Sequence, residues 1–172
     1  MILLLDEVKV SKSMKQVLKK NVFRFSFDTH FEYVIDACAG PRDYEEGTWI
    51  NSDMRNAYVK LHKLGYAHSI EVWQENEIVG GLYGVCLGKA FFGESMFAHA
   101  SNASKAALIY LCRFLQEREY HFVDCQMETE HLKSMGAKTI AKESFLKMLN
   151  ISNEFESLKG SWKKFILAGS LI

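Results

Sequence analysis

The chain has 172 residues, of which 48% are apolar and 13% aromatic, and it holds a single proline. This composition excludes a disordered tail or linker, and the length suits one domain, over residues 1–172, with a core of its own. Because 21 basic residues balance 21 acidic ones, overall charge does not attract nucleic acid, and such a partner would need a local basic patch.

Cysteine and histidine spacing argues against a disulfide or metal framework. The four cysteines are Cys38, Cys86, Cys112 and Cys125, and no two of them form a Cys-x-x-Cys pair. Scattered thiols of this kind are typical of reduced cysteines in a cytoplasmic protein. The six histidines also lack ligand spacing, so we expect no metal and no cofactor.

The apolar start of the chain, Met1 to Leu5, is too short to span a membrane. Asp6 and Glu7 follow it, where a signal peptide would need small residues. We therefore expect a cytoplasmic protein without a membrane partner, and a monomer.

Ser11 suits the N-cap of a helix that runs to about Lys20, and this predicted helix is basic. No acidic residue occurs between Val8 and Phe27. The lysines that we single out are Lys12, Lys15, Lys19 and Lys20. They form either a solvated helix face or a surface that binds phosphates.

Residues 22–27 then alternate apolar and polar side chains, which predicts a half-buried strand. Asp28 or Thr29 is placed to cap a second helix, which continues to Cys38. Apolar residues recur every three or four positions over residues 51–64 and predict a third helix.

The period changes to two after this helix. The pattern predicts three strands, over residues 69–73, 78–85 and 89–92, joined by tight turns. Such a run of hairpins is an antiparallel meander.

The pattern in the second half of the sequence predicts alternating strands and helices. A broad apolar stripe over residues 102–119 marks the strongest helix of the sequence, and residues 121–126 read as a buried strand. A short helix ending at Gly136, a strand near residues 137–140 and a helix from Lys142 follow. The predicted fold class is therefore α/β (α+β), a mixed sheet in which a βαβα half follows the meander.

Asp124 and Gln126 are two residues apart on the predicted strand, so we expect both side chains on one face. The neighbours Phe122, Val123 and Cys125 suit a buried strand. A carboxylate in such a strand needs a hydrogen-bonding or charged partner, or it has a functional role. Ligands of open α/β sheets gather at the carboxyl ends of strands, which is where Asp124 lies. Asp124 is therefore either a capping residue or part of a site.

Glu94 and Ser95 follow the predicted strand over residues 89–92 and Gly93, whose missing side chain leaves the backbone free to turn. A hydrolase nucleophile would need a Gly-x-Ser-x-Gly elbow, and this run lacks the second glycine. We therefore interpret Ser95 as a turn hydroxyl or a substrate hydrogen bond rather than a nucleophile.

Several longer motifs resemble those of the leucyl/phenylalanyl-tRNA–protein transferase family, collinearly from about Val10 to about Leu149. The motifs are Glu46-Gly47-Thr48-Trp49-Ile50, Ala67-His68-Ser69-Ile70-Glu71-Val72-Trp73, Val79-Gly80-Gly81-Leu82-Tyr83-Gly84-Val85, Gly93-Glu94-Ser95-Met96-Phe97, Asn102-Ala103-Ser104-Lys105 and Asp124-Cys125-Gln126. The resemblance implies a GNAT-like fold.

The resemblance also implies transfer of leucine or phenylalanine, with methionine as a further candidate, from aminoacyl-tRNA to proteins with N-terminal arginine or lysine, which marks them for N-end-rule degradation. It assigns an apolar pocket for the transferred side chain to Leu82, Phe91, Leu108, Leu111, Leu115 and Val123. Positions near the aminoacyl end of the tRNA are Trp49, Tyr58, Glu94 and Ser95. Asp124 and Gln126 match the catalytic positions, and the four lysines fall where the family has positive charge for tRNA.

The pleat of a strand turns Val123 away from Asp124, so we expect both at one site only if the strand splays or bulges. Relatives carry an N-terminal region with a Trp-Trp motif upstream of the position of Met1. We therefore interpret the apolar residues 1–5 as a severed or reannotated beginning, because an exposed patch of this kind would be a liability. Leu111 and Leu115 replace bulkier aromatics, which leaves the choice between leucine and phenylalanine open. Thr129 stands where relatives often have asparagine.

Two alternatives remain open from the residues. A GNAT-like acyl-CoA N-acetyltransferase should open the helix after the hairpin with a glycine-rich pyrophosphate loop, whereas residues 97–104 contain no glycine. A non-catalytic protein that binds tRNA or peptides is the second alternative.

Overall fold

A computed structural model describes residues 1–40 and 50–165 of the chain. A six-stranded sheet forms its centre, in the order β1-β6-β5-β4-β3-β2. The strands are β1 (Ile2–Leu4), β2 (Arg24–Phe27), β3 (Ala67–Gln74), β4 (Glu77–Leu87), β5 (Ala90–Ala98) and β6 (Phe122–Asp124). The helices are α1 (Lys12–Lys19), α2 (Phe31–Cys38), α3 (Ser52–Lys63), α4 (Ala103–Gln116), α5 (Glu130–Ser134) and α6 (Lys142–Asn153).

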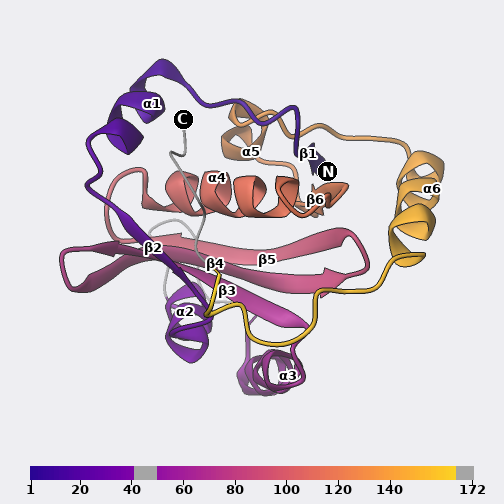
Figure 1. The fold of residues 1–172 in the computed structure, drawn as a ribbon, viewed down its shortest axis with the longest axis horizontal. Helices are drawn as coiled ribbons and strands as arrows, with labels where there is room; N and C mark the ends of the chain where they lie inside the picture. Colours follow the sequence, from indigo (N-terminus) through magenta and orange to yellow (C-terminus); the bar gives the residue numbers. More distant parts are fainter. Residues whose placement is uncertain (41–49, 166–172) are drawn as a thin grey trace.

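The sheet is mixed, as the sequence predicts. Every neighbouring pair is antiparallel except β5 and β6, which are parallel and connected through α4. Helices cover both faces: α4 and α5 lie on one side of the sheet, and α2 and α3 on the other (Figure 1). The predicted α/β class and the meander of β3, β4 and β5 are therefore confirmed.

Helix α4 is buried along most of its length and forms the largest core cluster with the sheet. Its approach to β4 is close because Gly80 has no side chain: a Cβ there would lie 2.5 Å from the Cβ of Ala103. A second cluster lies on the opposite face, under α2 and α3, and includes Val34, Ile35 and Tyr83. The two faces of β4 and β5 thus carry separate cores. No helix of residues 1–40 and 50–165 is long and apolar enough to cross a membrane.

The apolar start of the chain does not form an exposed patch. Residues 2–4 form the edge strand β1, which pairs antiparallel with β6, and Leu3 is fully buried. A strand of three residues carries too little local pattern to be predicted, and its pairing depends on a partner 120 residues later in the chain. The predicted strand at residues 137–140 is wrong: it reduces to one antiparallel bridge, between Ile2 and Lys138.

Strand β5 is longer than predicted, and Gly93 to Phe97 lie inside it. The register explains how these residues fit: Gly84 pairs with Gly93 and Tyr83 with Ser95, so Glu94 is the extra residue of a β-bulge. The interpretation of Ser95 as a turn hydroxyl is therefore wrong. Glycine and polar residues weaken the strand pattern, and pairing with β4 overrides it.

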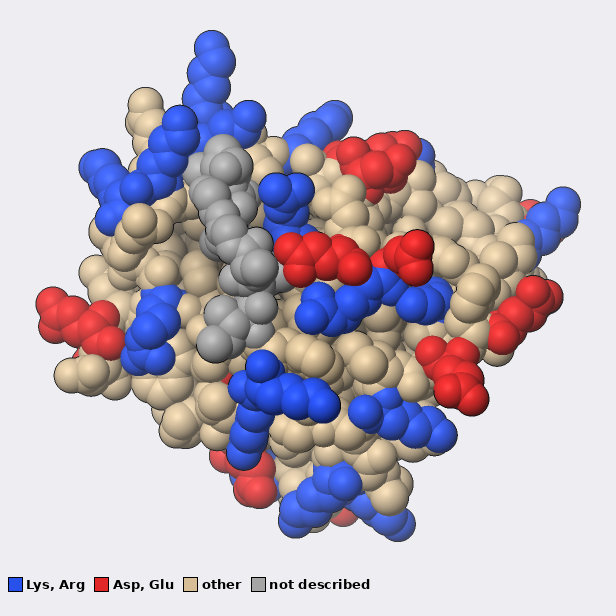
Figure 2. All heavy atoms as spheres, viewed as in Figure 1, with Lys and Arg blue, Asp and Glu red and all other residues tan. Residues whose placement is uncertain are grey.

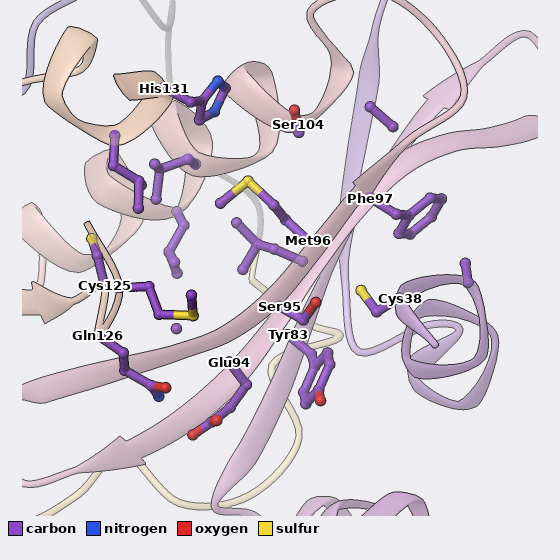
Figure 3. Close-up of a pocket in the computed structure, with 18 of the residues that line it drawn as sticks. Cys38, Tyr83, Glu94, Ser95, Met96, Phe97, Ser104, Cys125, Gln126 and His131 are labelled. Carbon is purple, nitrogen blue, oxygen red and sulfur yellow. The ribbon is translucent and has the colours of Figure 1, made fainter. Parts of the chain in front are cut away.

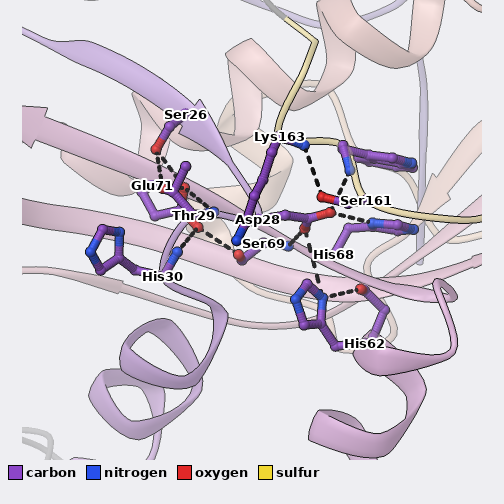
Figure 4. A network of polar contacts seen from close by, with 12 residues as sticks. Ser26, Asp28, Thr29, His30, His62, His68, Ser69, Glu71, Ser161 and Lys163 are labelled. Carbon is purple, nitrogen blue, oxygen red and sulfur yellow. Dashed lines mark hydrogen bonds and ion pairs between the residues drawn. The ribbon is translucent and has the colours of Figure 1, made fainter.

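Glu71 on β3 takes over the capping role that the sequence assigns to Asp28 or Thr29. Its carboxylate is fully buried and accepts hydrogen bonds from the backbone N–H groups of Thr29 and His30, each at 3.3 Å, at the start of α2. Hydroxyls of Ser26, Thr29 and Ser69 also donate to it, at 2.5, 2.7 and 2.6 Å (Figure 4). A buried charge is stable here because each oxygen has partners.

Asp28 instead holds the C-terminal segment against the sheet. Its buried carboxylate accepts from the Trp162 backbone N–H at 2.7 Å, from the Ser69 N–H at 2.9 Å and from His68 Nδ1 at 3.0 Å. The Trp162 ring stacks on His68 with centroids 3.7 Å apart. These residues come from distant parts of the chain, and Figure 4 shows Asp28 beside His68.

Candidate functional site

A cavity of about 1070 Å³ surrounds the second half of β5. Seven consecutive residues, from Gly93 to His99, line it. Successive side chains of a strand point to opposite faces. A cavity lined by all of them must therefore run along the edge of the strand and open onto both faces of the sheet.

The first part of the cavity lies between the sheet and helices α4 and α5, and we call it the α4 compartment. Its apolar lining residues are Leu82, Met96, Leu108, Leu111, Val123 and Leu132. Figure 3 shows Met96 pointing into this space below His131 and Ser104. The compartment therefore offers an apolar surface with polar groups at its ends.

The second part faces α2 and α3, and we call it the α2 compartment. Cys38, Tyr58, Tyr83 and Phe97 line it. The Tyr58 hydroxyl forms a hydrogen bond with the Glu94 carboxylate, and burial followed by this bond raises the pKa of Tyr58. Tyr58 therefore remains a neutral phenol that can hold the carboxylate of the bulge residue in place.

Strand β6 ends at Asp124, and Gln126 adopts a left-handed conformation with φ 57°. The Gln126 backbone N–H donates to Asp124 Oδ1 at 2.8 Å, which fixes the turn. The expectation that both side chains share a strand face is wrong, because the strand stops before Gln126. The Asp124 carboxylate nevertheless fixes the conformation of the Gln126 backbone through this hydrogen bond.

Gln126 lines the cavity, whereas Asp124 is not among its lining residues. Figure 3 shows the Gln126 amide and the Glu94 carboxylate pointing to the same side of the cavity. Val123 and Cys125 also line it, so the strand presents Val123 to the cavity without a bulge. Burial, and then the charge of Asp124, raise the pKa of the Cys125 thiol to about 12.

The cavity gathers most of the catalytic and substrate-binding residues selected from the sequence. These lining residues are Tyr58, Leu82, Glu94, Ser95, Leu108, Leu111, Val123 and Gln126. Phe91 and Leu115 are fully buried in the core and are not among the lining residues. Trp49 and its motif, apart from Ile50, lie outside the described residues.

Sequence reasoning missed Met96, His131 and Leu132 as cavity residues. His131 Nε2 is buried without a hydrogen-bond partner among the described residues, and burial and the charge of Lys105 lower the pKa of its ring. Thr129 also lines the cavity, and its hydroxyl accepts the Leu132 N–H at 3.2 Å as the cap of α5. The sequence could have indicated Met96 as a cavity residue only if the strand β5 had been predicted over its full length.

The four lysines selected from the sequence lie on and beside α1 and are not among the residues that line the cavity. Lys12, Lys15 and Lys19 belong to the helix and Lys20 is its C-cap; all four are exposed, while Met14 and Leu18 anchor the opposite side in the core. Figure 2 shows Lys and Arg side chains gathered at the upper left, where Figure 1 has α1. In the described part of the chain, no group of three or more His, Cys, Asp or Glu residues could hold a metal ion.

The match to a family model and the matches to individual curated proteins indicate the same family. Residues 2–150 match the model of the family described as leucyl/phenylalanyl-tRNA protein transferase. A protein of that name from Legionella pneumophila (strain Corby) is 49% identical over 94% of this chain and 72% of its own length. One from Nitrosomonas europaea is 48% identical over 94% of this chain and 69% of its own length.

A solved structure supports the fold alone. An aminoglycoside acetyltransferase from an uncultured soil metagenomic sample superposes with a TM-score of 0.53 at 14% identity, over 71% of this chain and 92% of its own. The architecture is therefore GNAT-like, and the low identity carries no argument about substrate.

Proposed function

Because the chain belongs to the leucyl/phenylalanyl-tRNA protein transferase family, we propose that its cavity transfers leucine or phenylalanine from aminoacyl-tRNA to the α-amine of a protein with N-terminal arginine or lysine. The tagged protein would then enter N-end-rule degradation. The family's aminoacyltransferase chemistry is the premise, and the choice of donor and acceptor is the proposal.

The cavity geometry supports this proposal most directly. An apolar compartment adjoins polar groups of Glu94 and Gln126 in one space of about 1070 Å³. Pockets for drug-sized ligands measure roughly 300–1,000 Å³. The space is therefore large enough for an aminoacyl-adenosine end together with the first residue of an acceptor. The apolar α4 compartment suits the leucine or phenylalanine side chain.

The reaction can proceed without a covalent intermediate between the substrate and the protein. The acceptor nitrogen attacks the ester carbonyl carbon, an amide bond forms, and the ester C–O bond breaks to leave a ribose hydroxyl. The acceptor ammonium first loses one proton to water, and when the neutral amine attacks, one of its two remaining protons ends on the ribose hydroxyl while the other stays on the amide nitrogen. Because an α-amine has a reference pKa of about 7.7–8.0, a useful fraction is neutral near pH 7.5. Proximity and orientation can then supply most of the acceleration.

We assign the Gln126 amide to the reacting centre and Asp124 to the ordering of Gln126. The 2.8 Å bond from the Gln126 N–H to Asp124 supports this division, as does the position of Gln126 in the cavity lining. Glu94, held by Tyr58, is placed to attract the basic first residue of the acceptor. The assignment makes Gln126 the catalytic residue and Asp124 a positioning residue.

Helix α1 is the proposed contact for the tRNA backbone. Its three lysines and the C-cap Lys20 are exposed, and the first turn contains no acidic residue that would repel phosphates. Since overall charge is balanced, binding would depend on this local patch and weaken as salt rises.

The proposal is tested by incubating the protein with labelled leucyl-tRNA or phenylalanyl-tRNA and a peptide that begins with arginine. The same peptide beginning with alanine is the acceptor control, and acetyl-CoA replaces the tRNA as the donor control. We expect transfer only from the aminoacyl-tRNAs and only to the arginine peptide. Acetylation of either peptide, or no transfer from tRNA, would contradict the proposal.

A further inference from the structure

Strand β5 has a partner on only one side beyond Phe92. Its parallel pairing with β6 covers Ala90 to Phe92, whereas its pairing with β4 continues to Ala98. No other strand of the described chain pairs with this edge. The backbone of the second half of β5 is therefore an open strand edge, and it lies inside the cavity.

The register identifies the groups that face this opening. The His99 N–H donates to the Val79 carbonyl at 2.8 Å, so residues 79 and 99 form a hydrogen-bonded pair of the antiparallel ladder. Such pairs alternate along a ladder. Met96 and Ala98, which stand opposite Leu82 and Gly80, must then direct their N–H and C=O groups away from β4 and toward the open edge.

On this basis, and resting on the proposed function, we propose that the open edge of β5 binds the acceptor polypeptide as an added strand. The acceptor would lie extended along Glu94 to Ala98, a length of about 17 Å at the rise of a β-strand. Its first residue would lie at the Gln126 end, beside Glu94, where β6 turns away. The remainder would run parallel to β5, toward His99.

The chemistry of the edge selects a polypeptide rather than RNA. A strand edge presents donors and acceptors in alternation at a fixed spacing, and a polypeptide backbone carries the same alternation. An RNA backbone carries phosphate acceptors and 2′-hydroxyl groups, but not the alternating N–H and C=O groups at the spacing of a strand edge. Backbone pairing also predicts weak dependence on the acceptor sequence after its first residue, because no side chain of the acceptor takes part in these bonds.

Backbone N-methylation of the acceptor tests the proposal without altering the protein. Six-residue peptides beginning with arginine would each carry one N-methyl group, at position 2, 3, 4 or 5, and steady-state transfer from leucyl-tRNA would be measured. We expect KM to rise about tenfold or more at alternate positions, the factor that 1.4 kcal/mol represents. The intervening positions are the matched controls and should stay within about twofold of the unmodified peptide.

A protein variant gives a second measurement. Ala98→Pro removes an N–H that faces the opening and bonds to no strand, a position that tolerates proline. The variant should raise KM for the unmodified peptide while its affinity for leucyl-tRNA and its unfolding midpoint stay unchanged. If the variant does not fold, the peptide series decides alone.

The outcomes separate this proposal from the proposed function. Transfer to the unmodified peptide with a KM that does not alternate with the N-methyl position would overturn strand addition while the transfer activity stands. A wild-type KM in folded Ala98→Pro would overturn it as well. Absence of transfer to the unmodified peptide would instead refute the proposed function.

Discussion

Trp162 gives the sharpest test of how the C-terminal segment holds the fold together. Its side chain is fully buried, stacks on His68 and lies 4.7 Å from Phe114 between ring centroids. The indole Nε1–H also donates to the Leu158 carbonyl at 3.1 Å. Truncation of a buried tryptophan to alanine costs about 3–5 kcal/mol. We expect Trp162→Ala to fall in this range, because the ring contacts are lost while the backbone bond to Asp28 can remain.

Urea unfolding followed by circular dichroism measures the effect, with thermal unfolding as a second readout. Because a domain's stability is about 5–15 kcal/mol, this loss is a substantial fraction of it, and at the lower end the whole of it. The midpoint temperature of the variant should fall by roughly 6–20 °C. Phe155→Ala is the matched control, since Phe155 belongs to the same segment but is 48% exposed; it should cost about 1 kcal/mol or less. Equal losses in the two variants would refute the account of the core.

Three further predictions concern the site and its surroundings. Asp124→Ala, which removes the acceptor of the Gln126 N–H, should slow single-turnover transfer far more than it weakens aminoacyl-tRNA binding, because the residue orders Gln126 rather than holding the donor; equal losses in both would contradict this role. Replacing Lys15 and Lys19 together by alanine should weaken tRNA binding and reduce the slope of affinity against salt by about 2, whereas a matched double change on α6 should not. The raised pKa of Cys125, about 12, keeps the thiol protonated at pH 8, and reactivity should grow as pH rises. Its alkylation at pH 8 should therefore be about three orders of magnitude slower than that of a free thiol of pKa 8.5, and alkylation at the free-thiol rate would show that the thiol is not buried.

The parts of the fold predicted from sequence are those governed by local pattern. Helix α4 was predicted because its apolar stripe is long, and the hairpins because their turns are marked by Glu75-Asn76 and Leu87-Gly88. Strand β1 was missed because three residues show no period. The extension of β5 was missed because its pairing with β4 depends on a bulge at Glu94 that no local signal marks.

The candidate site divides in the same way. The apolar stripe of the helix predicted over residues 102–119 includes Leu108, Leu111 and Leu115; the first two line the cavity, whereas Leu115 is buried in the core. The relation of Asp124 to Gln126 was predicted from an assumed strand, whereas the chain turns after Asp124. The buried bond between Asp28 and Trp162 joins residues 134 positions apart, and no property of either residue in the sequence indicates the other.

The central claim is that the α4 compartment receives the side chain of the transferred amino acid, and Met96→Trp tests it most directly. Met96 is only partly buried and points into the cavity (Figure 3), so an indole there should fill the compartment without disturbing the core. Leu146→Trp is the control, on an exposed position of α6.

The measurement is the rate of transfer of labelled leucine or phenylalanine from tRNA to an arginine peptide, with the unfolding midpoint recorded for each variant. The account predicts that Met96→Trp remains folded, still binds uncharged tRNA and loses transfer by at least about 100-fold, which corresponds to about 2.7 kcal/mol. Leu146→Trp should retain wild-type transfer. Wild-type rates with both donors in folded Met96→Trp would contradict the claim.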